Sequence, residues 1–406
     1  MIRELTADCV HCGFCLPTCP TYVLWNEEMD SPRGRIHLMD ARLDGTVTLN
    51  TTVTTHFDRC LGCMACLSSC PSGVRYDRLI ETTRAAVEAE YERPWSDRLL
   101  RGLLFRVLPY PARMRAALAL AELGRGAPLP RRFRPLVEVA PPWRGRGEVA
   151  DVTRPEGVRR GRVGVLTGCV QRAVFPAVNA ATARVLAADG YEVAAPSQGC
   201  CGALSVHAGR LEEGKTFARE LITAFGDVEL VVVNSAGCGS HLKELGWLLG
   251  DERAADFAAK VRDVGEFLAG VQPRARRHPL PMKVALQDSC HLRHAQALPL
   301  ASLSALGRIP ALDVVEPAEQ DICCGSAGIY NIVEPEAARE LGDRKAAHVL
   351  ATGAQAYASA NPGCLVQVSQ ALRRVRRPLP ALHPIELVDA SIRNVGTGRL
   401  LSRARR

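Results

Sequence analysis

No stretch of 18 or more consecutive apolar residues occurs in this sequence, so it predicts no membrane-spanning helix. The first residues reach Cys9 through charged side chains and lack the apolar core of a signal peptide. We therefore expect a cytoplasmic protein, and peripheral contact with the inner face of the cell membrane is left open. Outside a secretory context disulfides are not expected, so the 16 cysteines indicate metal ligands or redox thiols.

Aromatic residues and lysine are also scarce. Aromatic residues make up 5% of the chain and lysine occurs at only five positions, so the net charge of +8 comes from dispersed arginines. This pattern does not predict a nucleic-acid partner. A Gly-x-Gly-x-x-Gly fingerprint after a strand is absent as well, so no flavin or nicotinamide site is expected on this chain. A length of 406 residues with 47% hydrophobic content predicts two or three domains with buried cores.

What the sequence does contain is a pair of matching cysteine runs near its start. Residues 9–20 and 60–71 both follow the spacing Cys-x2-Cys-x2-Cys-x3-Cys-Pro. A cubane [4Fe–4S] cluster takes four thiolates, and in two-cluster proteins the fourth cysteine of each run ligates the other cluster. Zinc sites use paired Cys-x-x-Cys units instead, which these runs do not match. We therefore expect one cluster on Cys9, Cys12, Cys15 and Cys70, and a second on Cys60, Cys63, Cys66 and Cys19.

The other eight cysteines lie in a second half that is an internal duplication. Each copy opens with a β-rich run, at 163–166 and 284–287, and continues through a lone cysteine to Cys-Cys-Gly at 200–202 and 323–325. Helical stretches near 211–225 and 334–350 follow, and then an apolar run and a last cysteine. Such alternation predicts α/β units with a mostly parallel sheet. The two sets are Cys169, Cys200, Cys201 and Cys238, and Cys290, Cys323, Cys324 and Cys364.

The role of these eight cysteines stays open between three interpretations. A further metal centre in each copy is favoured, because four cysteines recur at matching places. Redox thiols without metal and buried structural thiols are the alternatives. Adjacent cysteines need irregular backbone to face one site, and Gly202 and Gly325 would permit such a turn. His291 and His294 flank Cys290 and could ligate a metal or relay a proton, although structural histidines are the simpler interpretation.

The predicted fold class is α+β and multidomain. A mostly helical ferredoxin-type domain with two [4Fe–4S] clusters is expected over residues 1–90, followed by a Pro- and Arg-rich helical linker over 91–160. Two α/β Cys-Cys-Gly domains are expected over 161–275 and 280–395. Within the linker, residues 99–123 combine Leu, Phe and Met with arginines. They predict packed helix, with contact to an anionic membrane face as the alternative.

Several of these motifs, in this order, resemble the iron–sulfur subunit of bacterial glycolate oxidase, and the likeness covers nearly the whole chain. The motifs are Cys-Val-His-Cys-Gly-Phe-Cys at 9–15, Ser-Pro-Arg-Gly-Arg-Ile at 31–36, Asp-Arg-Cys-Leu-Gly-Cys at 58–63 and Gly-Cys-Cys-Gly at 199–202. The resemblance implies a complex with a flavin-containing catalytic subunit and a second FAD-type subunit. It also implies oxidation of glycolate to glyoxylate, with electrons passed to quinone or another acceptor, and it implies that the eight N-terminal cysteines are the cluster ligands.

Two departures and two alternatives accompany this resemblance. The chain begins close to Cys9, where members of the family often carry a longer extension, and it has His241 and Gln367 where heterodisulfide-reductase-type relatives carry another cysteine. No substrate site is expected on this chain, so it would be an enzyme only as a subunit of an oxidoreductase acting on CH–OH donors. A related complex for lactate, glycerol 3-phosphate or a heterodisulfide is one alternative. A metal-stapled scaffold without electron transfer is the other.

Overall fold

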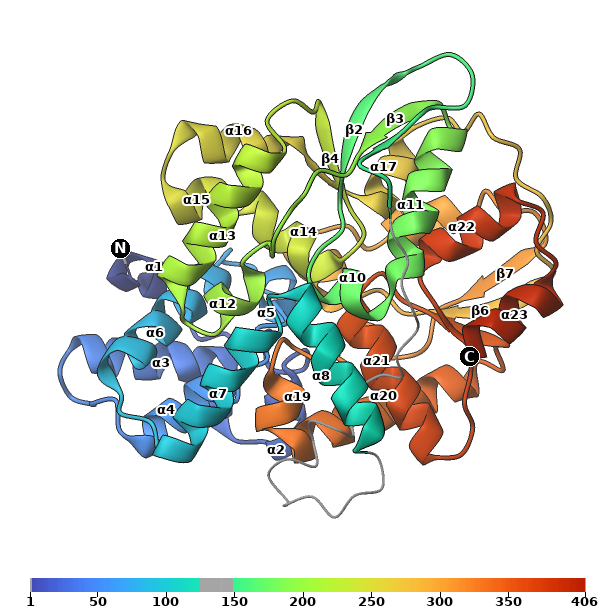
Figure 1. Cartoon of the computed structure of the whole chain (residues 1–406). Coiled ribbons are helices and arrows are strands. Elements are labelled where there is room, and N and C mark those ends of the chain that lie inside the picture. Colours follow the sequence, from blue (N-terminus) through green and yellow to red (C-terminus); the bar gives the residue numbers. More distant parts are fainter. Residues whose placement is uncertain (1, 125–139, 141–148, 406) are drawn as a thin grey trace.

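The computed structural model describes residues 2–124, 140 and 149–405 (Figure 1). Its N-terminal part is helical, and residues 2–90 contain no strand, as predicted for a helical ferredoxin-type unit. A short 3-10 turn, η1 (Glu28–Asp30), joins α2 to α3. The helices are α1 (Ile2–Ala7), α2 (Pro20–Trp25), α3 (Pro32–Leu43), α4 (Thr51–Asp58), α5 (Ala65–Ser68) and α6 (Tyr76–Glu90).

A buried arginine ties these short helices together. The Arg35 side chain, on α3, is 1% exposed and forms an ion pair with Asp30 at 3.3 Å. It also donates to the hydroxyl of Thr21 on α2 at 3.2 Å and to the carbonyl of His56 on α4 at 2.6 Å. Asp30 in turn accepts from Arg59 at 2.9 Å. A buried charge is tolerated only when it is paired and hydrogen-bonded, so this network fixes the positions of α2, α3 and α4.

Two longer helices, α7 (Trp95–Val107) and α8 (Pro111–Leu123), follow in the segment predicted to be a helical linker. The buried face of α7, Leu104 and Phe105, packs against Ile329 and Leu204 from the two later repeats. The opposite faces of both helices carry exposed apolar side chains. The proline-rich stretches at 128–132 and 141–143 lie outside the described residues. The predicted domain bounds stay a prediction.

The first sheet has the strand order β1-β3-β2-β4-β5. Its strands are β1 (Val152–Thr153), β2 (Gly161–Leu166), β3 (Tyr191–Ala194), β4 (Leu230–Val233) and β5 (Val261–Asp263). All neighbours are parallel except β1, which pairs antiparallel with β3. The connecting helices are α10 (Val170–Val174), α11 (Pro176–Ala188), α12 (Ala203–His207), α13 (Leu211–Ala224), α14 (Ala236–Lys243), α15 (Leu245–Leu249), α16 (Glu252–Lys260) and α17 (Val264–Gly270).

The second sheet repeats the same plan, with the all-parallel order β7-β6-β8-β9. Its strands are β6 (Met282–Leu286), β7 (Leu312–Val315), β8 (Ala356–Ala358) and β9 (Ala381–Leu382). With β6 in the place of β2, this order matches β3-β2-β4-β5, so the predicted duplication is confirmed. The helices are the π-helix η3 (His291–Ala295), α18 (Ala301–Leu306), α19 (Tyr330–Val333), α20 (Pro335–Ala351), α21 (Pro362–Arg374), α22 (Pro384–Ile392) and α23 (Thr397–Arg405).

Equivalent hydrogen bonds cap the start of the helix that follows the final strand of each sheet, α17 and α22. Helix α17 begins with a capping box in which Asp263 accepts from Gly265 N at 2.8 Å while Glu266 accepts from Asp263 N at 3.0 Å. Helix α22 begins with the equivalent pair, His383 and Glu386. Each box satisfies backbone donors that a helix start otherwise leaves unpaired. The helices α17 and α22 therefore begin with the same capping arrangement, in which only the N-cap side chain differs.

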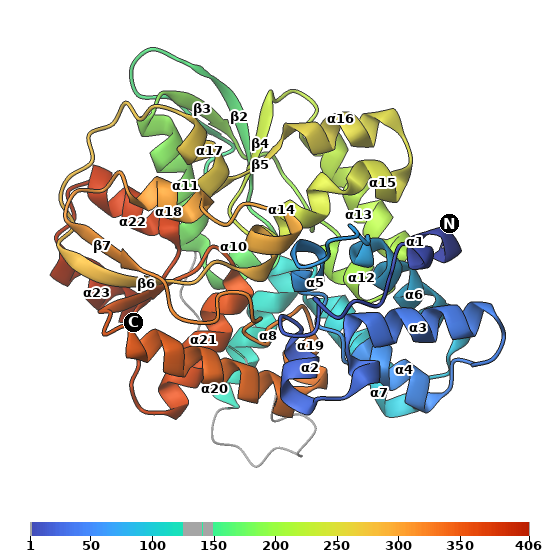
Figure 2. The ribbon, with the colours of Figure 1, turned by 180° about the vertical axis from the view of Figure 1, so that it is seen from behind.

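The two repeats pack into one body, which lies beside the N-terminal helices (Figures 1 and 2). Helix α11 packs on α22, and α17 packs on α18. Arg184 of α11 joins Asp389 of α22 through bonds of 2.9 and 2.7 Å. A single hydrophobic core contains residues of both sheets, including Val165, Val232 and Val284.

Asp189, at the end of α11, holds the segment that connects the two repeats. Its carboxylate accepts from the backbone N–H groups of Arg274 and Ala275, each at 2.9 Å, and pairs with the Arg277 guanidinium at 2.7 Å. The Asp189 side chain is 1% exposed and that of Arg277 is 9% exposed. This buried ion pair therefore fixes the connection between the repeats.

Replacing Asp189 by Asn should destabilise the protein by about 3–5 kcal/mol, because the cation of Arg277 stays buried without its partner. Urea unfolding followed by circular dichroism measures the loss. Asp227→Asn is the matched control, since Asp227 is exposed and surface changes cost about 0.5 kcal/mol or less. Equal midpoints for the two variants would contradict the assigned role of Asp189.

Candidate iron–sulfur centres

The first cysteine run borders a cavity of about 30 Å³ beside α3 and α6. The wall of this cavity contains all four cysteines predicted for the first cluster, together with Cys66. Cys12 is exposed, and the other members of the predicted set are partly exposed. The cysteines in the wall are Cys9, Cys12, Cys15, Cys66 and Cys70.

A second cavity, of about 20 Å³, lies deeper, and its wall contains the four cysteines predicted for the second cluster: Cys19, Cys60, Cys63 and Cys66. All four are buried. Since Cys66 belongs to both walls, the two cavities are neighbours. The structure thus brings each predicted set of four to one place, and ligation itself stays a prediction.

Backbone geometry explains how the runs converge. His11 and Met64 take φ angles of +53° and +63°, in the left-handed region that side-chain-bearing residues rarely adopt. Each of these residues reverses the chain within its run, and in the second run the short helix α5 begins directly after Met64. Pro20 starts α2 directly after Cys19, which ends the first run, and its ring is suited to a first helical position.

Burial acts strongly on the thiols of the second set. Desolvation raises the pKa of Cys63 and of Cys66 well above the ordinary value. Cys60 behaves differently: burial opposes its ionisation, yet the charges of Arg35 and Arg84 outweigh burial and lower its pKa. In the first set, burial raises the pKa of Cys15 to about 11. Metal binding needs thiolates, so iron would have to displace these protons.

The arrangement fits a cubane cluster. Five cysteines line the first cavity and four line the second, so each wall contains the four thiol groups that a cubane cluster takes, one for each iron. Within the described ranges, no group of three or more His, Cys, Asp or Glu side chains is placed to hold one metal ion. The donor set of each cavity is all thiolate, which is the set that iron–sulfur clusters use.

The cysteines of the first repeat are also brought together. The sulfurs of Cys169 and Cys200 lie 3.3 Å apart. Cys201 hydrogen-bonds to Cys200 and to Cys238, so the four thiols form a chain of contacts. Hydrogen bonds from Cys169 and Cys201 lower the pKa of Cys200 well below the ordinary value.

The second repeat has the same chain of contacts. The sulfurs of Cys290 and Cys323 lie 3.9 Å apart, and Cys324 hydrogen-bonds to Cys323 and to Cys364. The expected turn residues are present, because Gly202 and Gly325 have φ angles of +93° and +86°. A Cβ atom at either glycine would collide with a backbone carbonyl of the next long helix, so only glycine fits.

The thiols of the second repeat lie next to the second cavity. Leu61 and Cys63 pack in one buried cluster with Ile322 and Cys323. Burial is the main cause of the raised pKa of Cys63, and the negative charge of Cys323 is the next. Any redox group held by the second repeat would therefore lie beside the second cavity.

The two residues that replace a further cysteine support the repeats instead. His241 hydrogen-bonds to the backbone of Cys201, and burial lowers the pKa of His241 to about 4. Gln367 donates to the carbonyl of Ala338 at 2.6 Å. The histidines near Cys290 contact the N-terminal lobe: His291 Nε2 donates to the Gly62 carbonyl at 2.9 Å, and His294 pairs with Ser68 at 2.6 Å.

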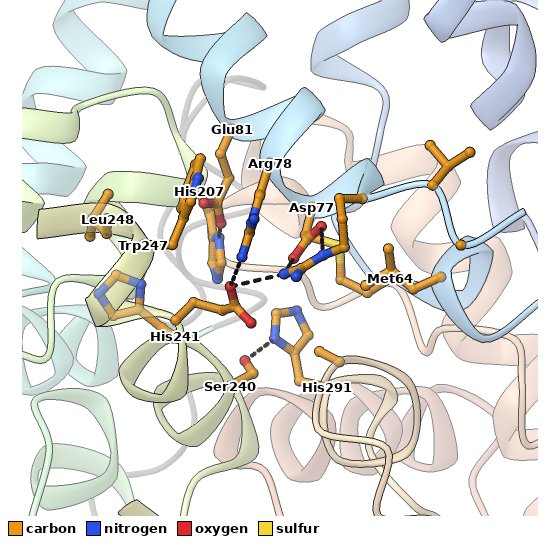
Figure 3. Close-up of a pocket in the computed structure, with 16 residues that line it drawn as sticks. Met64, Asp77, Arg78, Glu81, His207, Ser240, His241, Trp247, Leu248 and His291 are labelled. Atoms are coloured by element: carbon orange, nitrogen blue, oxygen red, sulfur yellow. Dashed lines mark hydrogen bonds and ion pairs between the residues drawn. The ribbon is translucent and has the colours of Figure 1, made fainter. Parts of the chain in front are cut away.

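Sequence reasoning missed a polar pocket where the N-terminal lobe meets both repeats (Figure 3). The pocket has a volume of about 290 Å³. His207 from the first repeat lies 2.8 Å from Glu81 of α6, and His291 accepts from Ser240 at 2.6 Å. Arg75 and Arg78 both contact one carboxylate oxygen of Glu244, at 2.9 and 3.4 Å.

Burial shifts the two partners at the centre of this pocket in opposite directions. It raises the pKa of Glu81 to about 7 and lowers the pKa of His207 to about 4. Both groups are thereby pushed towards their neutral forms, and a proton on the Glu81 carboxyl would lie within hydrogen-bond distance of His207 Nδ1. No spacing signal could have found this pair, because its members stand on helices far apart in the sequence.

This architecture defines a class of protein: an iron–sulfur protein with a two-cluster domain and paired cysteine-rich domains. Residues 6–74 match the family model described as a 4Fe-4S dicluster domain. Residues 163–243 and 284–369 each match the model described as a cysteine-rich domain. The bounds of the two latter matches bracket the cysteine sets of the two repeats.

The chain belongs to the family of glycolate oxidase iron–sulfur subunits. It is 37% identical to the probable glycolate oxidase iron–sulfur subunit of Bacillus subtilis (strain 168), over 90% of this chain and 89% of that protein. It is 36% identical to the glycolate oxidase iron–sulfur subunit of Escherichia coli (strain K12), over 96% of each. Lactate utilization protein A of Oceanobacillus iheyensis is 30% identical over 56% of this chain and 96% of that protein.

The comparisons confirm the predicted iron–sulfur class. Both glycolate oxidase relatives are named as subunits, which indicates that proteins of this family work in complexes. Across the described residues, no helix is both long and apolar enough to cross a membrane.

The swapped ligand sets can be tested with paired serine variants. Cys70→Ser should lower the iron content of anaerobically purified protein by about four atoms per chain, because one cluster is lost. Adding Cys12→Ser should cost no further iron, since both residues are assigned to the same cluster. Adding Cys63→Ser instead should remove the second cluster too.

Iron analysis together with EPR of the dithionite-reduced protein measures the outcome. Ser72→Ala, in the wall of the same cavity, is the control and should keep full iron. The reverse pattern, in which Cys70→Ser and Cys63→Ser act on one cluster, would show that the runs are not crossed.

Proposed function

We propose that this chain is the electron-transfer iron–sulfur subunit of a glycolate oxidase complex. In this complex a flavin subunit oxidises glycolate to glyoxylate, a second FAD-type subunit takes part, and electrons leave to an acceptor such as quinone. The observation that carries the proposal is the pair of adjacent cysteine-lined cavities with Cys66 in both walls. The family membership given above supports the choice of complex.

The proposed ligands are Cys9, Cys12, Cys15 and Cys70 for one [4Fe–4S] cluster, and Cys60, Cys63, Cys66 and Cys19 for the other. Bound clusters would supply one-electron transfer. The chain's own contribution is burial and charge. Buried Arg35 and partly buried Arg84 act on Cys60, and Tyr76 donates to its sulfur at 3.7 Å, which stabilises negative charge there.

We also propose the domain bounds 1–90, 91–160, 161–275 and 280–395. The helical lobe, the two linking helices and the two sheets support them, while β1 of the first sheet lies within 91–160 and α23 lies after residue 395. A further metal centre is proposed for the cysteine sets of the repeats. The chains of contacting thiols support it, and the contact between Cys63 and the Cys323 region favours the second repeat as the neighbour of the second cluster.

The flavin partner is proposed to bind near the first cavity. Cys12 is exposed there, and the flanking side chains of Val10 and Phe14 are 68% and 66% exposed. Exposed apolar side chains beside a redox site suit a protein partner, because binding would bury them. Close approach of the partner at Cys12 would shorten the distance over which an electron has to travel.

A lactate-oxidising complex is the second candidate. The likeness to lactate utilization protein A favours it, although it covers only 56% of this chain. The substrate would bind a partner chain in either case, so rates with the two acids decide between the candidates. We place the complex in the cytoplasm, at the inner face of the membrane, where the exposed leucines of α7 and α8 would have an apolar surface to contact.

The complex, co-expressed with its flavin subunits, should reduce a dye such as dichlorophenolindophenol with glycolate, and this chain alone should not. Faster dye reduction with lactate would favour the second candidate. A complex that contains the flavin subunits but gives no EPR signal from reduced clusters would instead favour the metal-stapled scaffold. Flavin and iron analysis of the same preparation checks that all parts are present.

Replacing Phe14 by Glu should weaken co-purification of the flavin subunit, because a charge would be buried at the contact. A pull-down at increasing salt measures the loss, which we expect to exceed tenfold in affinity. Val158→Glu is the control, since Val158 is 79% exposed on another part of the molecule. Equal binding by both variants would place the flavin partner elsewhere.

A further inference from the structure

An apolar groove lies between α7, α8 and the helices of the two repeats. Its volume is about 510 Å³, by far the largest of the cavities described here. Its walls are formed almost entirely by hydrocarbon side chains. Six of them are Leu104, Leu108, Leu118, Val174, Ile332 and Val366. A groove of this size and character fits a long apolar chain rather than a small polar metabolite.

The groove leads inward to the second cysteine set. A smaller cavity of about 70 Å³ shares Leu204 and Gly328 with the groove. It also shares Cys60 and Leu61 with the wall of the second cysteine cavity. A ligand that enters along the groove would therefore end beside a proposed cluster ligand.

The inner end offers neutral hydrogen-bonding groups. The Tyr330 side chain lines the smaller cavity, the residue is 4% exposed, and its hydroxyl has no partner among the described residues. An unpartnered buried hydroxyl is costly unless something binds it. His207 lines the same cavity, and its Nε2 is likewise buried with no partner in the described part of the chain.

The charged groups at this end are already paired. Arg84 donates to the carbonyls of His207 and Phe57, at 2.9 and 3.2 Å. Arg101 pairs with Asp97 at 3.0 Å and with Asp58 at 3.5 Å. A carboxylate or phosphate head group would need an available cation, whereas a carbonyl oxygen needs only a hydroxyl donor. The inner end therefore favours a neutral head with carbonyl oxygens.

The outer end of the groove is exposed and apolar. Leu103 and Leu120 line the groove and are 46% and 69% exposed. Leu99 and Leu123, which are 61% and 85% exposed, extend the same faces of α7 and α8. An apolar rim of this kind suits a ligand that arrives from a lipid bilayer.

We propose that the groove and the smaller cavity together bind a membrane quinone, with the isoprenoid tail between α7 and α8 and a ring carbonyl within reach of the Tyr330 hydroxyl. This site rests on the proposed function, because it names where the acceptor of that function binds. The reaction balances: glycolate loses two electrons and two protons on becoming glyoxylate, and the quinone gains two of each on becoming the quinol.

His207 connects this site to the polar pocket of Figure 3, because it lines both cavities. Its Nδ1 faces Glu81 at 2.8 Å. The proton shared with Glu81 lets Nε2 act as donor or acceptor, as a ring oxygen requires before and after reduction. The second oxygen takes its proton from solvent.

Two tryptophan variants on one helix test the groove. Ala117 of α8 lines the groove, whereas its neighbour Ala116 is exposed. In the purified complex, Ala117→Trp should lower the ratio of decylubiquinone reduction to dye reduction by about tenfold or more, because the indole fills the path of the tail. Ala116→Trp should keep the ratio of the unmodified complex.

Tyr330→Phe tests the inner end and leaves packing intact, because it removes only the unpartnered hydroxyl. It should weaken binding of decylubiquinone to the oxidised complex on the order of tenfold, the scale of one hydrogen bond. Ultrafiltration followed by chromatography measures this binding without any turnover. Dodecanoate, which has a similar tail and a charged head, should compete poorly.

The outcomes separate this site from the proposed function. If glycolate reduces the dye but Ala117→Trp and Tyr330→Phe leave quinone binding and the reduction ratio unchanged, the quinone site is wrong and the function stands. If dodecanoate displaces decylubiquinone at equal concentration and Tyr330→Phe has no effect, the groove binds acyl chains. If glycolate does not reduce the dye at all, the proposed function fails first.

Discussion

Eight thiol groups share a small volume of the N-terminal lobe, and the cost of removing their negative charge from water is the constraint on which the rest of the structure depends. Burial, followed by the negative charge of neighbouring thiolates, raises the pKa of Cys63 and Cys66 well above the ordinary value. Positive charge has to offset this, and the chain supplies part of it through Arg35, whose side chain is itself buried and paired with Asp30. Bound iron would supply the remainder. Three short helices of this lobe serve that need, because α2 and α4 carry the partners Thr21 and His56 of Arg35, and α5 carries Cys66.

The two repeats cover the buried cysteines of the N-terminal lobe. His291 reaches from the second repeat to the carbonyl of Gly62, and Arg84 of the N-terminal lobe donates to the carbonyl of His207 in the first repeat. The loop with Cys60 and Cys63 is therefore covered by both repeats, while the loop with Cys12 stays at the surface. This asymmetry gives the molecule an exposed end and a buried end, and the proposed flavin contact and the proposed acceptor groove lie at these different ends.

The features that the sequence predicted correctly are those that depend on the spacing of residues close together in the chain. The cysteine spacing placed the members of each cavity wall, and the recurrence of Cys-Cys-Gly predicted two units with one strand order. The sequence could not predict that Glu81 pairs with His207, nor that the buried hydroxyl of Tyr330 lacks a hydrogen-bond partner among the described residues. These depend on the packing of helices that are far apart in the chain. The antiparallel β1 was missed because two residues carry no periodic signal, and the π-helix after Cys290 has no recognisable sequence pattern.

The contacts between the repeats have a further meaning. Helix α11 of the first repeat corresponds to α18 of the second, and α17 corresponds to α22, so the pairs α11–α22 and α18–α17 are one contact made twice. Such self-complementary contact is the mark of a two-fold dimer. Within one chain the two repeats therefore meet as the protomers of a two-fold dimer would. The single N-terminal lobe breaks this two-fold relation, so equivalent positions such as His241 and Gln367 have different surroundings: His241 contacts the backbone of Cys201, and Gln367 donates to the carbonyl of Ala338.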